Sequence, residues 1–256
     1  MPNTEKPKEK LSVLVTGASG SLGRAIAIQH AAPAVRLSLW GRDSDRLEET
    51  RQAVEARAAT ARIVQCDVTQ AQSAADLVAD EDASGAFDIA YLVAGTGETK
   101  PVDARVESPD LVVRSILTNF AGPAAMAAAL ADRMADRGTG RIVLIGSAAG
   151  HHSLPFASAY AGSKAGLARF ADALRIAVAP HGVSVTLAAP GFLDTPGRTD
   201  NAPMLLPVEE AARRIIAAGD RRDGHFVTPW AFRALRAVDA VLPGRLRDAL
   251  LRRLAP

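Results

Sequence analysis

The sequence predicts an α/β fold, a doubly wound parallel sheet of about seven strands with helices on both faces. Short apolar runs alternate with segments of helical periodicity along most of the 256 residues. These runs are apolar nearly throughout, which is typical of strands buried on both faces of a parallel sheet. The chain has no internal repeat, no low-complexity segment and no long linker. We therefore expect a single domain.

The first half of the chain predicts four strands joined by three helices. The first two strands are 11–15 (LSVLV) and 35–40 (VRLSLW), with a helical stretch at 22–31 between them. This strand–helix–strand order is that of a parallel βαβ unit. The alternation continues with a helix over 45–58, a strand over 61–66, a helix after residue 69 and a strand over 87–93.

The second half predicts two long helices, 111–137 and 156–179, on either side of a strand at 140–145 (GRIVLI). Another strand follows at 183–188, and a last strand signal ends at Pro229. Apolar runs of this length, bounded by glycine or proline, are typical of buried strands.

Beyond Pro229 the pattern changes to two basic amphipathic helices. Residues 221–256 hold eight Arg against three Asp, a local charge of +5, so the rest of the chain sums to −3. We expect these helices to pack on the same domain, over a pocket or against a second subunit, and binding to an anionic membrane surface is the alternative. Their apolar residues recur at helical spacing at Trp230, Ala234, Val238 and Val241, then at Leu246, Leu250 and Leu254.

Composition and charge narrow the class of protein. With 48% hydrophobic and 23% charged residues, the chain resembles an ordinary globular domain. A net charge of +2 and 4% aromatic residues offer little for nucleic-acid binding. Arg, Asp, Gly or Pro cuts every apolar run well before about 20 residues, so we expect no membrane-spanning helix. The expected partner is a small molecule, without nucleic acid.

The start of the chain and its single cysteine predict a cytoplasmic protein. Residues 1–10 are charged and lack the apolar segment of a secretory signal, so we expect a flexible tail. One thiol, Cys66, cannot form an internal disulfide. We interpret it as a small buried hydrophobic residue.

A glycine-containing turn follows the first strand and opens the first helix, with the sequence T-G-A-S-G-S-L-G. Glycines in such a turn let the backbone approach a pyrophosphate, whose charge is met by the free N–H groups of the helix. The same glycines are compatible with a tight turn and a close helix–strand contact. The cofactor-binding candidates here are Gly17, Ser19, Gly20, Ser21, Leu22 and Gly23.

A second chemical signal is the pair Tyr160 and Lys164. Residues four apart share one face of a helix, so the ammonium of Lys164 is expected near the phenol of Tyr160. A nearby positive charge favours the ionised phenol and lowers its pKa from about 10. Such a phenol can give a proton to a carbonyl oxygen or take one back.

Together these motifs resemble the short-chain dehydrogenase/reductase family, whose single-domain members are NAD(P)-dependent oxidoreductases with a Rossmann-type sheet. The resemblance runs from about 11 to 195. It implies that Ser147, thirteen residues before Tyr160, binds the substrate carbonyl, and that Asn119 holds a water in the proton relay. On its own, Ser147 is compatible with a strand-end hydrogen bond and Asn119 with a helix kink. The implied catalytic set is Asn119, Ser147, Tyr160 and Lys164.

The resemblance also implies cofactor contacts beyond the glycine turn. Asp67 and Val68 are implied at the adenine, Ala94 and Gly95 at the adenosine ribose, and Lys164 at the nicotinamide ribose. Tyr160 also belongs to the implied cofactor-binding set. The loop that receives the carboxamide is implied at Pro190, Gly191, Leu193 and Thr195. Asp67 is also compatible with a helix cap, and Pro190-Gly191 with a simple turn.

The end of the second strand favours NADP over NAD. Arg42 follows that strand, where a guanidinium can pair with a 2′-phosphate. Asp43 is evidence for NAD, because it lies twenty residues after Gly23, about where an NAD-type acid is expected. We interpret Asp43 as the cap of the next helix.

Two departures from the family pattern stand out. Ser21 replaces the middle glycine, so the spacing is T-G-x-x-G-x-x-G, that of the larger epimerase-type branch. Leu92 and Val93 occupy positions where the family commonly has asparagine. We therefore expect that a hydrogen bond steadying the central sheet is missing.

The leading prediction is an NADP-dependent oxidoreductase that interconverts a ketone or aldehyde and an alcohol. The alternatives are a sugar-nucleotide epimerase- or dehydratase-like enzyme and a non-catalytic NADP-binding protein. The chain is expected to divide into the tail 1–10, a dinucleotide-binding catalytic domain over 11–229 and the C-terminal helices over 230–256, packed on the same domain.

Apolar and aromatic side chains near the expected site predict the substrate pocket. Its candidates are His151, Phe156 and Phe192. His151 and His152 are adjacent, point apart and have no evident third ligand, so no metal is expected. The helix over 156–179 resembles the family's dimer-forming helix, which implies a homodimer or homotetramer.

Overall fold

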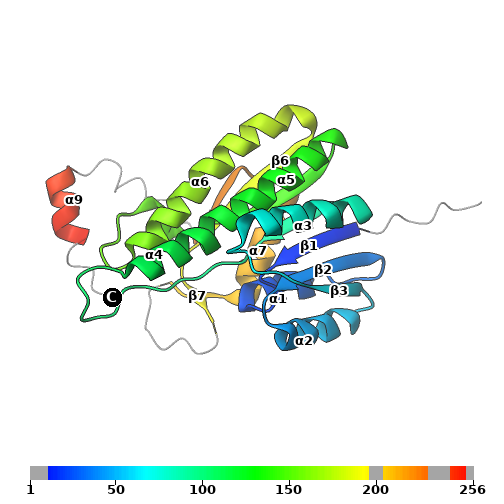
Figure 1. Ribbon diagram of the computed structural model, residues 1–256, viewed down its shortest axis with the longest axis horizontal. Coiled ribbons are helices and arrows are strands. Elements are labelled where there is room, and N and C mark those ends of the chain that lie inside the picture. Colours follow the sequence, from blue (N-terminus) through cyan, green and yellow to red (C-terminus); the bar gives the residue numbers. More distant parts are fainter. Residues whose placement is uncertain (1–10, 196–203, 230–242, 252–256) are drawn as a thin grey trace, which may run out of the picture.

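The computed structural model describes residues 11–195, 204–229 and 243–251. Its centre is a seven-stranded parallel sheet in the order β3-β2-β1-β4-β5-β6-β9 (Figure 1). The predicted doubly wound α/β sheet of about seven strands is therefore confirmed. The strands are β1 (Leu11–Thr16), β2 (Val35–Gly41), β3 (Thr60–Gln65), β4 (Ile89–Leu92), β5 (Gly140–Ile145), β6 (Val183–Pro190) and β9 (His225–Thr228).

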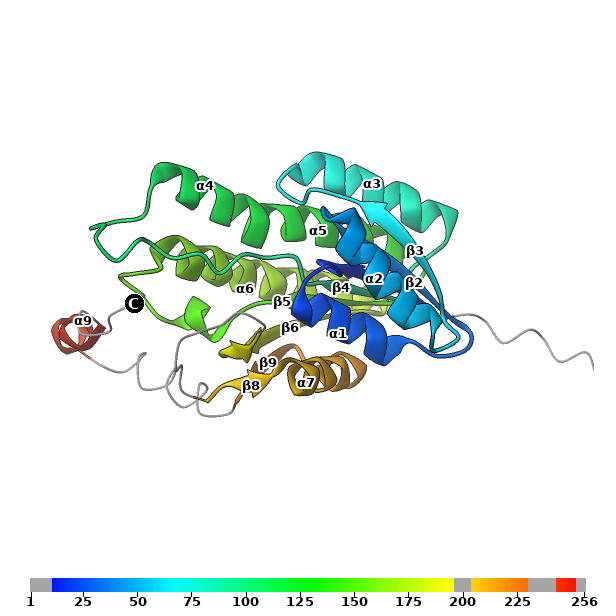
Figure 2. The ribbon, with the colours of Figure 1, turned by 90° about the horizontal axis from the view of Figure 1, so that it is seen from below.

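Helices cover both faces of the sheet because successive strand residues point to opposite sides. Val13 and Val15 of β1 lie in one core cluster, whereas Leu14 lies in the other. The first face packs against α1 (Ser21–His30), α2 (Ser44–Glu55) and α7 (Val208–Asp220). The second packs against α3 (Ala71–Ser84), α5 (Gly122–Asp136) and α6 (Ser158–Val178). Figure 2 shows α3 and α5 on one side of the sheet and α1 and α7 on the other.

The helix expected over 111–137 is not a regular α-helix. It begins as α4 (Pro109–Ile116), widens into one π-helical turn, η1 (Leu117–Ala121), and continues as α5. Gly122 follows the wide turn, and a Cβ there would lie 2.1 Å from the carbonyl oxygen of Val68. Only glycine permits this approach of α5 to the loop after β3.

The continuous helix Pro109–Asp136 has 28 residues and a mean hydropathy of 1.3 in its most apolar window, so by length and composition alone it could span a membrane. The sequence shows no uninterrupted apolar run of that length, because the helix joins separate apolar pieces. In the fold, α5 packs against α3, α6 and the sheet. These contacts are those of a core helix in a globular domain.

Two short helical turns flank α6. The 3₁₀ turn η2 (Ala148–His151) follows β5, and η3 (Ala179–His181) precedes β6. A Cβ on Gly150 would lie 2.9 Å from the backbone carbon of Lys164, so the turn after β5 lies directly on α6.

Several elements were not among those predicted. These are α7 and the small parallel pair β7 (Leu193–Asp194) and β8 (Leu206–Pro207). The buried positions Val208, Ala211, Ala212 and Ile215 do give α7 helical spacing. The helix α9 (Gly244–Leu251) lies within the second expected C-terminal helix. The tail 1–10, residues 196–203, the first C-terminal helix with Trp230, and residues 252–256 lie outside the described residues.

Candidate active site

The candidate residues gather at the carboxyl edge of the sheet, because parallel strands all end on the same side. The strand order reverses between β1 and β4, the position where open α/β sheets bind ligands. The loops after these two strands touch, since a Cβ on Gly17 would lie 2.9 Å from the backbone nitrogen of Ala94. The predicted glycine turn and the predicted Ala94-Gly95 segment are therefore neighbours.

The glycine turn has the geometry of an anion cradle. Gly17 has φ +64°, a left-handed conformation that favours glycine. A Cβ on Gly23 would lie 2.2 Å from the Gly17 carbonyl oxygen. Gly20 precedes α1, and no side chain caps the helix there, so its first N–H groups can bind an anion. The side chain of Leu22 packs into the core instead of toward this turn.

The hydroxyl of Thr16 joins the ends of β1 and β4. Its Oγ1 accepts hydrogen bonds from the backbone nitrogens of Val93 at 2.9 Å and Ala94 at 3.2 Å. The family's asparagine is absent from this junction, and we expected an unmade hydrogen bond. An asparagine side-chain bond cannot form here, since Leu92 and Val93 are apolar, but the Thr16 hydroxyl supplies a separate link between the two strands.

Asn119 is fully buried in the π turn and joins three segments. Its Oδ1 accepts from the Thr96 backbone nitrogen at 2.8 Å, and its Nδ2 donates to the Thr96 carbonyl at 3.0 Å. Nδ2 also donates to Ser163 Oγ at 3.3 Å. The side chain of Asn119 thus ties the loop after β4 to α6.

Lys164 lies beside Asn119 and Gly95. A Cβ on Gly95 would be 3.0 Å from Asn119 Oδ1 and 3.5 Å from Lys164 Nζ. Nζ donates a 2.8 Å hydrogen bond to the Ile145 carbonyl at the end of β5. The side chain is buried, and burial lowers the pKa of Lys164 to about 8. Near pH 8, Lys164 can therefore both hold and release a proton.

The pKa of the Tyr160 hydroxyl differs from the sequence expectation. Burial raises the pKa of the Tyr160 hydroxyl above its ordinary value, and a side-chain hydrogen bond from Ser147 opposes part of that rise. The lowering by Lys164 that the sequence suggested is absent; the Lys164 ammonium donates to the Ile145 carbonyl and is itself desolvated. Ser147 Oγ also accepts from the Ala149 nitrogen at 3.1 Å, which fixes its place after β5.

The end of β2 carries the residues expected to distinguish NADP from NAD. Asp43 caps α2, its Oδ1 accepting from the Arg46 nitrogen at 3.1 Å. The interpretation of Asp43 as a cap is therefore confirmed. Arg42 is exposed and has no hydrogen bond or ion pair to the described residues. Ser19 lies beside this strand end, since a Cβ on Gly41 would be 2.9 Å from Ser19 Oγ.

The remaining cofactor candidates lie on the loops after β3 and β6. Asp67 Oδ1 accepts from the Thr69 nitrogen at 3.0 Å, a local turn rather than a helix cap. Val68 is buried against Gly122. The segment beginning at Pro190 is tied at its base, where the Gly191 nitrogen donates to the Thr228 carbonyl at 2.8 Å. Leu193 pairs with β8, and Thr195 is the last described residue before 204.

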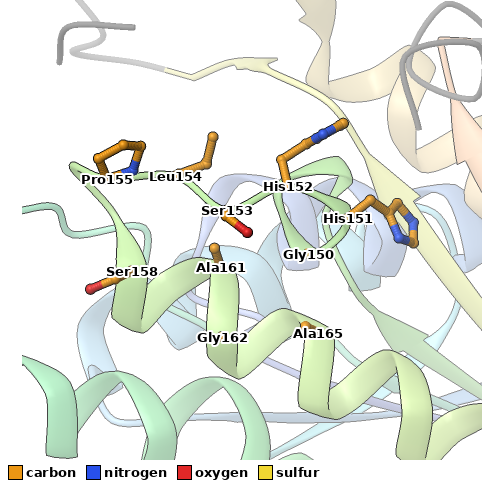
Figure 3. Close-up of a pocket in the computed structure, with 10 residues that line it drawn as sticks. All are labelled: Gly150, His151, His152, Ser153, Leu154, Pro155, Ser158, Ala161, Gly162 and Ala165. Atoms are coloured by element: carbon orange, nitrogen blue, oxygen red, sulfur yellow. The ribbon is translucent and has the colours of Figure 1, made fainter. Parts of the chain in front are cut away.

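A pocket of about 500 Å³ lies beside the loop after η2 (Figure 3). His151 lines it, whereas Phe156 and Phe192 do not. The helix α6 presents to it Ser158, Ala161, Gly162 and Ala165, which at 100° per residue face away from Tyr160 and Lys164. The pocket is therefore separate from the face of α6 that carries the Tyr–Lys pair, and the three predicted pocket residues do not form one cavity.

Sequence reasoning missed Thr16, Thr96 and Ser163. Ser163 Oγ donates to the Tyr160 carbonyl at 2.8 Å and accepts from Asn119. A serine inside a helix that bonds back to a carbonyl three residues earlier is a usual local pattern, so Ser163 carried no distinct signal. In the described parts of the chain, no three His, Cys, Asp or Glu side chains lie close enough together to hold a metal ion.

Comparisons with known proteins find similar sequences and similar folds. The model of the short chain dehydrogenase family matches residues 11–205. An uncharacterized oxidoreductase of Myxococcus xanthus is 35% identical over 248 residues, which cover 95% of this chain and 97% of that protein. Dehydrogenase/reductase SDR family member 7B of Danio rerio is 34% identical over 192 residues, which cover 72% of this chain and 61% of that protein.

Solved structures share the fold. A short-chain dehydrogenase from Sphingobium yanoikuyae in complex with NADPH has a TM-score of 0.78 at 24% identity, with 95% of this chain and 96% of that chain covered. The bulky-bulky ketone specific alcohol dehydrogenase from Comamonas testosteroni has a TM-score of 0.77 at 23% identity, with 93% and 96% covered.

The glycine turn generates a test of dinucleotide binding. Gly23→Ala would place a methyl group 2.2 Å from the Gly17 carbonyl oxygen, so α1 must move away from the turn. We expect the Kd for NADPH, measured by fluorescence titration, to rise by about tenfold or more. Gly97→Ala is the control, because a Cβ there meets nothing within 4 Å. An unchanged Kd in Gly23→Ala would contradict the cradle.

The buried lysine generates a test of stability against pH. Its pKa of about 8 in the folded protein lies below its usual 10.5, so between these values the unfolded chain binds more protons than the folded one. Raising the pH from about 7 to 10 should therefore stabilise the wild type relative to Lys164→Met by roughly 2–3 kcal/mol. Urea unfolding at several pH values measures the difference, and a pH-independent difference would contradict the assignment.

Proposed function

We propose that this chain, which belongs to the short-chain dehydrogenase/reductase family of oxidoreductases acting on CH–OH groups, is an NADP-dependent enzyme that interconverts a ketone or aldehyde and an alcohol. The observation that carries the proposal is the arrangement around α6. Tyr160 is hydrogen-bonded to Ser147, and Lys164 lies beside Asn119 and Gly95. This arrangement supplies a proton donor and a hydrogen-bonding group for one carbonyl oxygen.

The residues of the glycine turn fit a dinucleotide. Gly17 and Gly23 leave room where any side chain would clash, and the start of α1 has no side-chain cap. Gly17, Gly20 and Gly23 would hold the pyrophosphate, with Asp67 and Ala94 near the adenosine and Pro190 to Thr195 near the carboxamide. A nicotinamide cofactor, when bound, supplies or accepts the hydride.

The protein's own residues then handle the proton. In the direction of reduction, the Tyr160 hydroxyl donates its proton to the carbonyl oxygen as that oxygen gains negative charge, and Ser147 donates a hydrogen bond to the same oxygen. Burial keeps Tyr160 protonated at neutral pH, which is the form that reduction requires. Lys164, with a pKa of about 8, would resupply the proton to Tyr160 through the relay in which Asn119 holds a water. In oxidation the same proton moves the other way.

The preference for NADP rests on Arg42. Its guanidinium is exposed and has no partner among the described residues, so it can form a charge-assisted pair with a 2′-phosphate. The competing carboxylate, Asp43, is occupied as the cap of α2. An NAD enzyme would need a free acid at this turn to bind the ribose hydroxyls.

The proposal includes a homodimer or homotetramer and a cytoplasmic location. The resemblance of the segment over 156–179, most of which forms α6, to the family's dimer-forming helix supports self-association. The single cysteine supports a reducing compartment.

Tyr160→Phe tests the reaction. We expect turnover of carbonyl substrates, followed as NADPH oxidation across a carbonyl panel, to fall by about 10² to 10⁴, while the Kd for NADPH stays unchanged. Tyr91→Phe is the matched control, since the other tyrosine lies in the core and bonds to His30 at 2.9 Å. Full turnover in Tyr160→Phe would refute the proton donor, and NADPH binding without any turnover by the wild type would indicate a binding protein.

Arg42→Ala tests the cofactor preference. Loss of one charge-assisted pair, worth about 1.5–3 kcal/mol, should raise the Kd for NADPH by roughly 10- to 100-fold and leave the Kd for NADH unchanged. Arg57→Ala serves as the control. Arg57 lies just beyond the C-terminal end of α2, whereas Arg42 lies just before the N-terminal end of that helix. Equal or better efficiency with NADH in the wild type would overturn the preference.

A further inference from the structure

Glu107 carries a carboxylate that the reaction scheme does not use. It immediately precedes Ser108, the N-cap of α4, yet it is only 7% exposed and its side chain reaches the start of α6. Its Oε2 accepts a 2.7 Å hydrogen bond from the backbone nitrogen of Ala159 and a second one from the hydroxyl of Ser158. The other oxygen, Oε1, is buried with no hydrogen-bond partner among the described residues.

The helix that Glu107 contacts lacks a cap of its own. Ala157 occupies the N-cap position of α6, and no side chain from that position bonds to the first turn. The first N–H groups of a helix need acceptors from elsewhere, and a negative charge is favoured at that end. Glu107 supplies both from a distant part of the sequence. A second tie between the same segments runs from the Lys100 nitrogen to the Phe156 carbonyl at 3.1 Å.

The cap that Glu107 provides lies next to Tyr160, the proposed proton donor. Ala159, which donates to Glu107, directly precedes Tyr160. Tyr160 therefore belongs to the first turn of α6, the part of a helix that frays most readily. Lys164 lies one turn further and is fixed independently by the Ile145 carbonyl. A displacement of about 1 Å at a reacting group can cost 10²-fold in rate.

We propose that Glu107 is a positioning residue for Tyr160. It holds the first turn of α6 in its hydrogen-bonded form, so that the phenol stays beside Ser147. The inference rests on the proposed function, because the rate effect depends on Tyr160 as proton donor. It predicts a loss of kcat with little effect on cofactor binding, since the hydrogen bonds of Glu107 run to Ser158 and Ala159 at the start of α6 and the pyrophosphate would bind at the glycine turn after β1.

Three variants separate positioning from general stability. Glu107→Ala removes the acceptor and should lower kcat about tenfold or more, with the Kd for NADPH unchanged. Glu107→Gln keeps an acceptor oxygen but buries an amide NH₂ without a partner, so it should lower the unfolding temperature and retain kcat. Ser108→Ala is the matched control, since its Oγ caps the neighbouring helix α4 through the Leu111 nitrogen at 3.2 Å. It too should be less stable and fully active.

Hydrogen exchange gives a readout that does not depend on turnover. Amides over 156–164 should exchange faster in Glu107→Ala than in the wild type, Glu107→Gln or Ser108→Ala. Wild-type exchange in Glu107→Ala overturns the inference even if no carbonyl substrate is turned over, whereas a wild type that binds NADPH and reduces nothing refutes the proposed function alone. Equal loss of kcat in Glu107→Ala and Ser108→Ala, or in Glu107→Ala and Glu107→Gln, also overturns the inference.

If Glu107→Ala does not fold, Glu107→Asp carries the same test. It keeps the charge but is one methylene group shorter, so it cannot reach both donors of α6. We expect faster exchange over 156–164 and a lower kcat than in Glu107→Gln. Wild-type values for both measurements would overturn the inference.

Discussion

The buried hydrogen bond between the Lys164 ammonium and the Ile145 carbonyl connects the helix α6 to the carboxyl end of β5. Burial of a charged group costs free energy unless the group is hydrogen-bonded. The neighbouring backbone and side chains must therefore leave this contact intact. Gly150 must lack a side chain because its turn lies on the backbone of Lys164, and a Cβ on Gly95, next to Lys164, would come within 3.0 Å of Asn119 Oδ1. Asn119 lies beside Lys164 next to Gly95, and Ser147 lies beside Tyr160 at the end of β5.

Much of this arrangement could be predicted from the sequence, because strand and helix periodicities dominate the chain. The seven main strands form a parallel sheet, and most helix bounds agree to within a few residues. The π turn at Asn119 was not predicted, since a wide turn and a regular turn have the same apolar composition. The small pair β7–β8 has only two residues per strand, too short for a pattern.

The residues of the candidate site could be predicted from the sequence, but their burial and their hydrogen bonds to distant parts of the chain could not. Spacing places Tyr160 and Lys164 on one helix face, and the neighbouring charge then suggests a lowered pKa for the phenol. Burial instead raises the pKa of Tyr160 and is the largest cause of its shift, but burial depends on the whole fold. Likewise, the bonds of Thr16 to Val93 and of Glu107 to Ala159 join distant parts of the chain. Neither bond has a local signature.

The π turn η1 also keeps one face of the long helix that contains it directed toward the core. Leu111, Ser115, Asn119 and Pro123 are all buried and follow one another at intervals of four residues. In a regular α-helix of 3.6 residues per turn, such a series would rotate by about 40° at each step. In a π turn the hydrogen bonds join residues five apart, so the turn contains more residues than an α-helical turn. These additional residues compensate for the rotation. The extra residue thus keeps the side chains before and after Asn119 on a common buried face.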